Sequence, residues 1–286
     1  MGAGNMIRGR GWSLRARITA LLVATLVPLA GLGTYWVVWE VRQETTNVER
    51  QTRDSAARIA AQAADIIGDV QGMLAVLARL PAVQARDRGE AERLFRELLA
   101  TSSRLENFAA FTTDGTLFAA ATRGVPGVQI HVPDRAWFQA AVQSRQPVTS
   151  EFLVSRITGN PVAVLAYPIL DGRGQVLGVV AAALRLSAFS QEVAPTQPEA
   201  QSRWAVVDGQ DLVLLHGDPG AAIGKPLAPL TGMLRGEAGV PGTEWRAIVG
   251  IPEAVITARV RSELLDIGFP ALLILLVASG VGFWIA

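Results

Sequence analysis

Two long runs of uncharged, mostly apolar residues stand out in the chain, one near each end. The first covers residues 18–39; at ~1.5 Å per residue a helix of this length reaches ~33 Å, enough to cross a hydrocarbon core of ~30 Å. The second covers residues 267–286. The pattern predicts two transmembrane helices that bracket a more polar segment, residues 40–266.

Each run has an alternative interpretation. A cleaved signal peptide would explain the first run, but the run exceeds the usual ~7–15 apolar residues and lacks Ala-x-Ala-type cleavage spacing. A buried core helix would explain the second run, but its length and its lack of charge argue against this. We therefore expect an uncleaved anchor at 18–39 and a second membrane helix at 267–286.

The arginines near the N-terminus determine the expected orientation. Four arginines precede the first run, and no acidic residue does. Because positively charged flanks stay in the cytoplasm, residues 1–17 are predicted to form a cytoplasmic basic arm. The chain is then a multi-pass protein of a bacterial inner (cell) membrane, with residues 40–266 in the periplasm or outside the cell.

The segment outside the membrane begins with a long helix. Residues 41–80 contain no proline, and apolar side chains recur at alternating spacings of three and four, which is a heptad pattern. The seam consists of Ile59, Ala63, Ile66, Val70, Met73, Leu77 and Leu80. It packs either on its own domain or on a second copy of the chain, and the pattern leaves both open. Pro81 is expected to end the helix.

The pattern then changes to shorter elements. An apolar stripe over residues 88–102 predicts a second helix, and a short helix is predicted at 134–143 with Asp134 as its N-cap. Apolar stretches joined by tight turns with Asp-Gly predict three β-hairpins. Their paired strands are residues 108–112 with 116–121, 161–170 with 175–186, and 204–207 with 211–215.

A polar stretch with two prolines, residues 191–202, is interpreted as a linker between two lobes. The second lobe follows at residues 203–266. It is expected to end in a helix, residues 252–265, that leads directly into the second membrane segment.

Composition excludes some functions. All 25 acidic residues, and all basic ones except the four N-terminal arginines, lie in residues 40–266, so this segment has a net charge of about −3. Such a charge is a poor match to nucleic acid. The chain has no cysteine, so no disulfide stabilises this segment, but a domain of ~225 residues buries a sizeable core without one.

Motifs for catalysis and metal binding are absent from the sequence. The two histidines, His131 and His216, belong to separate lobes, and no HExxH-type spacing occurs. No arrangement pairs a nucleophile with a base, and no Gly-rich phosphate loop is present. We therefore predict no cofactor, no metal and no enzyme activity for this chain, and a membrane-tethered periplasmic enzyme is disfavoured.

Several motifs together resemble a known family. They are HVPDRAWFQAAVQSRQPVTSEF, TGNPVAVLAYPILDGRGQVLGVVAAALRL, WAVVDGQDLVLLH and WRAIVGIPEAVITA. Their order resembles the double Cache sensor domains of bacterial transmembrane receptors over residues 40–266, with DRAWF and YPILDGRGQVLGVV the most specific parts. The stretch LARLPAVQARDRGEAERLFRELL is most similar to the sensor histidine kinase branch.

The resemblance implies an α/β (α+β) fold of two PAS-like lobes, each an antiparallel sheet with helices, on a long N-terminal helix. Residues 40–190 would form this helix and a membrane-distal lobe, and residues 203–266 a membrane-proximal lobe with its exit helix. The distal lobe of the family usually binds a small molecule. Family members feed histidine kinases, diguanylate cyclases or chemoreceptors, and the first of these outputs is favoured for the parent of this chain. From the heptad seam, a homodimer is expected.

The resemblance also points to a ligand site in the distal lobe. Members that bind amino acids hold the ligand carboxylate with an Arg at the start of the distal helix, followed by a Trp. Arg135 and Trp137 occupy these positions, with Phe138 where many members have Tyr. A guanidinium forms bidentate, charge-assisted bonds to a carboxylate. The remaining candidates are Arg156, Tyr167 and His131.

The half of the motif that binds an amine is missing. Where the family clamps the ligand amine with a Tyr and two Asp residues, this chain has Leu153, Ser155 and Ala183. An ammonium group would find no carboxylate there, and an unpaired charge in a closed pocket is costly. We therefore expect a simple carboxylate or another anion as the ligand, not an amino acid.

These residues also have purely structural interpretations. Arg135 and Arg156 could form salt bridges or lie exposed, and Trp137 and Tyr167 could pack in the core. For the whole chain, the competing hypothesis is a ligand-free periplasmic protein-interaction module or an accessory membrane subunit. In the receptor hypothesis, a ligand that prefers one arrangement of the lobe shifts the population toward it.

Overall fold

The computed structural model of the chain describes residues 14–122, 129–193, 202–217, 221–255 and 257–258. The chain divides into two compact units, residues 49–252 and a unit made of residues 1–48 with 253–286. The helices are α1 (Leu14–Leu77), α2 (Pro81–Gln84), α3 (Arg88–Ala100), α4 (Ala136–Ser144) and α5 (Leu186–Val193). The strands are β1 (Leu105–Thr112), β2 (Leu117–Ala120), β3 (Val148–Thr149), β4 (Leu153–Val154), β5 (Pro161–Leu170), β6 (Val176–Arg185), β7 (Arg203–Val207), β8 (Val213–His216), β9 (Met233–Gly239) and β10 (Arg246–Pro252).

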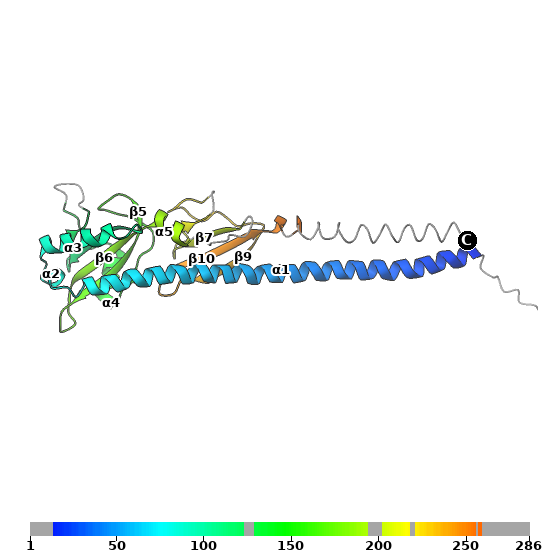
Figure 1. Cartoon of the computed structure of the whole chain (residues 1–286), viewed down its shortest axis with the longest axis horizontal. Helices are drawn as coiled ribbons and strands as arrows, with labels where there is room; N and C mark the ends of the chain where they lie inside the picture. Colours follow the sequence, from blue (N-terminus) through cyan, green and yellow to red (C-terminus); the bar gives the residue numbers. More distant parts are fainter. Residues whose placement is uncertain (1–13, 123–128, 194–201, 218–220, 256, 259–286) are drawn as a thin grey trace, which may run out of the picture. The chain divides into compact units, whose positions relative to one another are not determined.

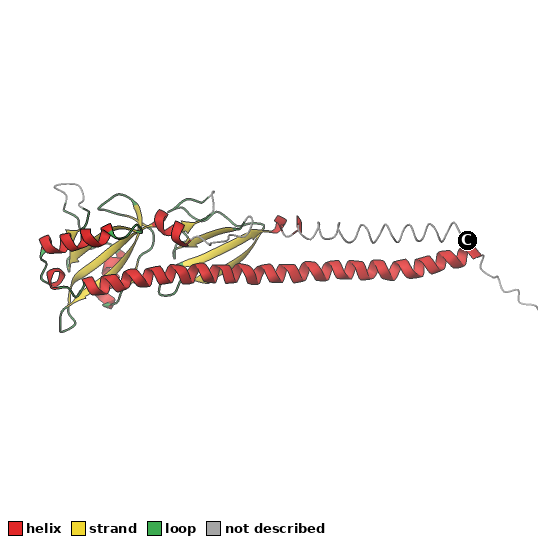
Figure 2. Ribbon diagram, viewed as in Figure 1, coloured by secondary structure: helices red, strands yellow, loops and turns green. Residues whose placement is uncertain are grey.

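These strands form two antiparallel sheets (Figures 1 and 2). The first has the order β2-β1-β6-β5-β3, with β4 also paired to β5, and the second has the order β8-β7-β10-β9. The three predicted hairpins are confirmed as β1–β2, β5–β6 and β7–β8. The predicted combination of a long N-terminal helix with two antiparallel sheets is confirmed as well.

The first sheet buries both of its faces, because successive side chains of a strand point to opposite sides. One face carries Phe108, Ala110 and Leu165, which belong to the same core cluster as residues of α1 and α3. The other face carries Phe111 and Val164 among others and is covered by α4. Both faces therefore need a helical cover, and only the α4 face also contains the cavity described below.

Helix α1 covers the first face together with α3. The seam residues Ile59, Ala63, Ile66, Val70 and Leu77 are buried in one cluster with strands of both sheets, and Met73 and Leu80 pack against that cluster. Of the two interpretations of the seam, packing on its own domain is therefore confirmed. A homodimer stays a prediction.

One helical segment among the described residues, Thr46–Leu77, is long and apolar enough to cross a membrane. Its large apolar side chains lie in the core except Val76, which is exposed, so this segment packs as a core helix. The membrane helix predicted at 18–39 falls inside α1, which is helical from Leu14. The one predicted at 267–286 lies outside the described residues, as does most of the predicted exit helix.

Several element boundaries differ from the sequence predictions. Helix α1 ends at Leu77, and Pro81 opens α2 instead of ending α1, because a proline is well suited to the first turn of a helix. The predicted linker at 191–202 begins inside α5, which extends to Val193, and residues 194–201 are not described.

The second sheet approaches the backbone of α1 at Gly236 in β9. A Cβ atom added there would lie 2.3 Å from the amide nitrogen of Arg53 and 2.3 Å from the carbonyl carbon of Thr52. Thr52 is itself buried at this contact. Since backbone atoms cannot move aside as a flexible side chain can, only glycine fits at position 236.

The two sheets are also joined by residues 150–152, which we call the strap, between β3 and β4. The indole N–H of Trp245 donates to the Ser150 carbonyl at 3.0 Å, and the Phe152 backbone N–H donates to Oδ2 of Asp208 at 2.9 Å. The Phe152 ring lies against Gly224, where an added Cβ would be 2.3 Å from the ring. The strap therefore belongs to the first sheet by sequence and contacts the second sheet.

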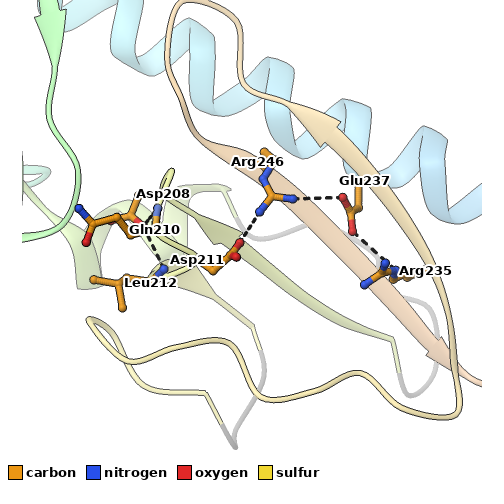
Figure 3. A network of polar contacts seen from close by, with 7 residues as sticks. All are labelled: Asp208, Gln210, Asp211, Leu212, Arg235, Glu237 and Arg246. Atoms are coloured by element: carbon orange, nitrogen blue, oxygen red, sulfur yellow. Dashed lines mark hydrogen bonds and ion pairs between the residues drawn. The ribbon is translucent and has the colours of Figure 1, made fainter.

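Asp208 is fully buried and organises the turn between β7 and β8. Its Oδ1 accepts hydrogen bonds from the backbone N–H groups of Gln210 (3.0 Å) and Leu212 (2.9 Å), as Figure 3 shows. Its neighbour Asp211 instead forms an exposed ion pair with Arg246, which also reaches Glu237 (Figure 3). Two carboxylates of one turn thus have different roles.

We expect Gly236→Ala to lower the free energy of unfolding by about 1–3 kcal/mol, because the added methyl group overlaps the backbone of α1. Gly239→Ala in the same strand is the control, since no atom lies within 4 Å of a Cβ there. Urea unfolding of the detergent-solubilised chain, followed by tryptophan fluorescence, measures both. Equal destabilisation by the two variants would contradict the close approach of β9 to α1.

Asp208→Asn should lower the free energy of unfolding by about 1–3 kcal/mol. Both carboxylate oxygens of Asp208 accept hydrogen bonds from backbone N–H groups, and in the variant the side-chain NH₂ would replace one of these acceptors. The matched control is Asp211→Asn, which removes an exposed ion pair and should change the free energy of unfolding by less than ~1 kcal/mol. The same unfolding assay compares the two. A larger loss in the Asp211 variant would show that the strap contact is weak.

Candidate functional site

A cavity lies between the first sheet, α4 and the loop that connects β4 to β5. Its volume is about 50 Å³, several times the ~10–15 Å³ that one water molecule needs on the same measure. Most of its lining is apolar and includes Ala109, Phe111, Val132, Val164, Ala181 and Ala183. The polar members of the lining are Asn107, Arg135, Ser155 and Arg156, with the Trp137 indole beside them. No Asp or Glu belongs to the lining that the structure describes.

Helix α4 positions Arg135 and Trp137. Its buried side chains, Trp137, Phe138 and Ala141, hold it against the sheet, and the Trp137 ring meets the Phe111 ring edge-on with centroids 5.7 Å apart. Arg135 precedes the helix as its N-cap, with an extended backbone (φ −79°, ψ 126°). The helix start is thus fixed by aromatic packing, and Arg135 is fixed with it.

The prediction that Asp134 caps this helix is wrong. The helix begins at Ala136, and its N-cap residue Arg135 makes no side-chain capping bond. The Asp134 carboxylate instead accepts two hydrogen bonds from Arg156, from Nη1 at 2.7 Å and from Nη2 at 2.6 Å. A bidentate charge-assisted pair is stronger than a capping bond to a neutral N–H.

Arg156 closes the outer side of the cavity. Besides Asp134, its Nη1 donates to the His131 carbonyl at 2.6 Å, so this arginine ties the β4–β5 loop to the segment before α4. The loop itself is fixed, because Ser155 Oγ accepts from the backbone N–H groups of Ile157 and Thr158 at 3.2 Å each. Arg156 is therefore an ordered side chain whose charge is already paired.

Arg135 has different surroundings. Its Nη2 donates to the Val154 carbonyl at 3.1 Å, and no carboxylate of the described residues lies within ion-pair distance of it. Burial lowers the pKa of Arg135 from its ordinary value, and the nearby Arg156 adds to this while Asp134 opposes it. A guanidinium stays charged regardless, so Arg135 presents a positive charge and free N–H donors to the cavity.

The structure brings three of the six predicted site residues to the cavity: Arg135, Trp137 and Arg156. Phe138 is buried behind Trp137. His131 is exposed, with its ring 3.4 Å from the Thr116 hydroxyl. Tyr167 packs with the cluster on the opposite face of the sheet. These three do not line the cavity.

Asn107 is a lining residue that the sequence analysis missed. It is buried in β1, its Oδ1 accepts from the Thr122 N–H at 2.9 Å, and its Nδ2 donates to the Thr122 carbonyl at 3.3 Å. The signal was present in the sequence, because Asn107 is a single polar residue that alternates with Ala109 and Phe111. Those three residues share the cavity face of the strand.

Comparison with known proteins gives a consistent result. The family model described as Cache domain matches residues 41–260. Among curated proteins, Sporulation kinase D of Bacillus subtilis (strain 168) is 24% identical over 106 residues, which are 37% of this chain and 20% of the kinase. The chain therefore matches only about a fifth of the length of that relative.

Solved structures of sensor domains share the fold. The ligand-binding domain of the Pseudomonas aeruginosa PAO1 chemoreceptor PctB, in complex with L-Arg, has a TM-score of 0.59 at 17% identity, covering 73% of this chain and 97% of that one. The Pseudomonas fluorescens chemoreceptor CtaA with L-leucine gives 0.59 at 13%, covering 74% and 97%. The sensor domain of the Vibrio cholerae histidine kinase DctB gives 0.55 at 12%, covering 72% and 98%.

The ion pair at the cavity predicts a measurable titration. The hydrogen bonds from Arg156 lower the pKa of the Asp134 carboxyl from 3.8 to about 2. Since the pKa in the folded state lies below the ordinary value, the pair is complete above about pH 4 and is lost as the pH falls toward 2. Carboxyl ¹³C NMR should show this midpoint, and Arg156→Gln should return it toward 3.8. An unshifted midpoint in the parent protein would exclude the pair.

Proposed function

The chain belongs to the Cache domain family of receptor sensor domains, and we propose that it senses a small carboxylate or another anion outside the cytoplasm and signals across the membrane. In this proposal residues 40–266 are periplasmic, and the lobe built on the first sheet is the membrane-distal one. The N-terminal arginines keep residues 1–17 in the cytoplasm. Membrane helices at 18–39 and 267–286 complete the arrangement.

One observation carries the choice of ligand. Arg135 contributes a positive charge, without a carboxylate partner among the described residues, to a cavity whose lining contains no acid. An anion would supply the missing partner through bidentate, charge-assisted hydrogen bonds. Trp137 and the aliphatic side chains around it would then cover an apolar part of the ligand.

An α-amino acid suits this cavity less well. Leu153, Ser155 and Ala183, the positions where amino-acid-binding members carry Tyr and Asp, all line the cavity. The ligand ammonium would therefore lose its water without gaining a carboxylate. The solved relatives bound to L-Arg and L-leucine have sequence identities of 17% and 13%, so their ligands do not transfer to this chain.

The contacts around the cavity support a route for the signal. Arg135 is bonded to the carbonyl of Val154 in β4, and β4 continues directly from the strap. The strap is held by Trp245 and Asp208 of the second sheet. A ligand that favours one spacing of α4 and β4 would thus shift the population of strap positions and, with it, the second sheet. The end of that sheet, β10, leads to helical residues at 253–255.

The output of the receptor is inferred from the relatives. The match to Sporulation kinase D and the shared fold with the DctB sensor domain favour a histidine kinase as the full-length protein, within a two-component system. Relatives that are chemoreceptors leave a different output open to test. A homodimer would allow the two second membrane helices to move relative to each other.

Isothermal titration of the detergent-solubilised chain with carboxylates, amino acids, polyamines and purines tests the ligand class. We expect a carboxylate to bind, and Arg135→Gln to weaken it at least ~30-fold, which corresponds to about 2 kcal/mol for a hydrogen-bonded charge. The control is Arg173→Gln, in the exposed β5–β6 turn, which should leave binding unchanged.

Two results would contradict this proposal in different ways. Tight binding of an α-amino acid that is lost in Arg135→Gln would show that the missing amine clamp was misread. Absence of binding in all four ligand classes would favour the protein-interaction module, and crosslinking in the periplasm would then be the informative measurement.

A further inference from the structure

Of the two arginines at the cavity mouth, only one has a carboxylate partner among the described residues. Two arginines, Arg135 and Arg156, line the cavity. The carboxylate of Asp134 is close enough to both arginines to interact with their charges, but it forms an ion pair only with Arg156. The charge that remains available to a ligand is therefore close to a single positive charge, on Arg135.

We propose that the Asp134–Arg156 pair makes this site selective for singly charged carboxylates with a short apolar chain and excludes dicarboxylates. The inference rests on the proposed function, since it specifies which anion the same cavity takes. In this proposal Asp134 is a residue that determines ligand specificity. Asp134 acts by occupying the second arginine, without itself contacting the bound carboxylate.

The geometry of the pair supports this role. Arg156 uses both terminal nitrogens on the Asp134 carboxylate, at 2.7 and 2.6 Å, and a further N–H on the His131 carbonyl at 2.6 Å. A guanidinium has five N–H donors in a fixed plane, and the end-on edge of Arg156, formed by Nη1 and Nη2, is the one that Asp134 engages. A second ligand carboxylate would therefore either displace Asp134 or use the side-on edge of a guanidinium whose charge Asp134 already balances.

The rest of the described lining offers a second negative charge no further cation. Asn107 has both ends of its amide bonded to the Thr122 backbone, and the Ser155 hydroxyl oxygen accepts from two backbone N–H groups. The other lining side chains are apolar apart from the Trp137 indole N–H. A second carboxylate would therefore lose water without gaining a cation, and Asp134 would repel it.

The pair is not explained by the needs of α4. Asp134 lies one residue before the N-cap, Arg135, and the helix start has no side-chain capping bond. It is exposed, as is Arg156, and an exposed ion pair contributes little to stability. The Asp134–Arg156 pair differs from other exposed ion pairs of the described residues in its position. It lies at the mouth of the cavity, next to Arg135, the lining arginine that has no carboxylate partner.

Matched four-carbon probes test the inference, namely butyrate and succinate in isothermal titration at pH 7 on the detergent-solubilised chain. We expect the parent protein to bind butyrate at least ~10-fold more tightly than succinate. Asp134→Asn frees Arg156 and should raise the affinity for succinate relative to butyrate by ~10-fold or more, the range expected for one charge-assisted pair. The double variant Asp134→Asn with Arg156→Gln should lose that gain.

The control for net charge is Glu97→Gln on α3, which removes one negative charge in an exposed i,i+4 pair with Arg93. It should leave the succinate-to-butyrate ratio unchanged. Equal affinity of the parent protein for both probes, or an unchanged ratio in Asp134→Asn, would overturn the inference while the proposed function stands. Failure of the parent protein to bind any carboxylate would instead refute the proposed function.

Discussion

The structure depends on one constraint, that each of its two sheets has an apolar face which packs against the same long helix, α1. Residues of α1 from Ala56 to Leu77 share one core cluster with strands of both sheets. Each buried Ile or Leu contributes roughly 1.5–3 kcal/mol, whereas an isolated helix gains little from its own backbone. Because the cover is shared, both sheets fall within one compact unit, residues 49–252, and β9 must approach α1 closely at Gly236.

The shared helix leaves the opposite face of the first sheet to a much shorter helix, and this determines where the cavity lies. Helix α4 has 9 residues, too few to cover strands of up to 10 residues on its own. The space beside it is closed by β4 and its loop, which Arg135 and Arg156 tie to the segment before α4. The cavity is thus bordered by short elements held by polar contacts. Such elements move more easily than a packed core.

Much of the fold was predictable because local rules and global packing agree. The three hairpins follow from apolar strands around tight turns, and α3 follows from its apolar stripe; the Asp87 cap at its start is seen only in the structure. Strands β3 and β4 have 2 residues each and depend on pairing with β5, so no local pattern could indicate them. Tyr167 was misplaced because its face of the strand depends on register, and Asp134 because a partner 22 residues away outcompeted the local cap.

Arg135 is best understood by asking why its neighbour does not neutralise it. Asp134 precedes it in sequence, yet the carboxylate pairs with Arg156, and Arg135 keeps only a neutral carbonyl acceptor. Its pKa is lowered by burial, which means that its charged form is less stable there than in water. Stability alone would favour a carboxylate at this position. In the proposed function, an anion from outside would supply the partner that this cation lacks, and the free energy of that pairing would then be available to shift the protein between conformations.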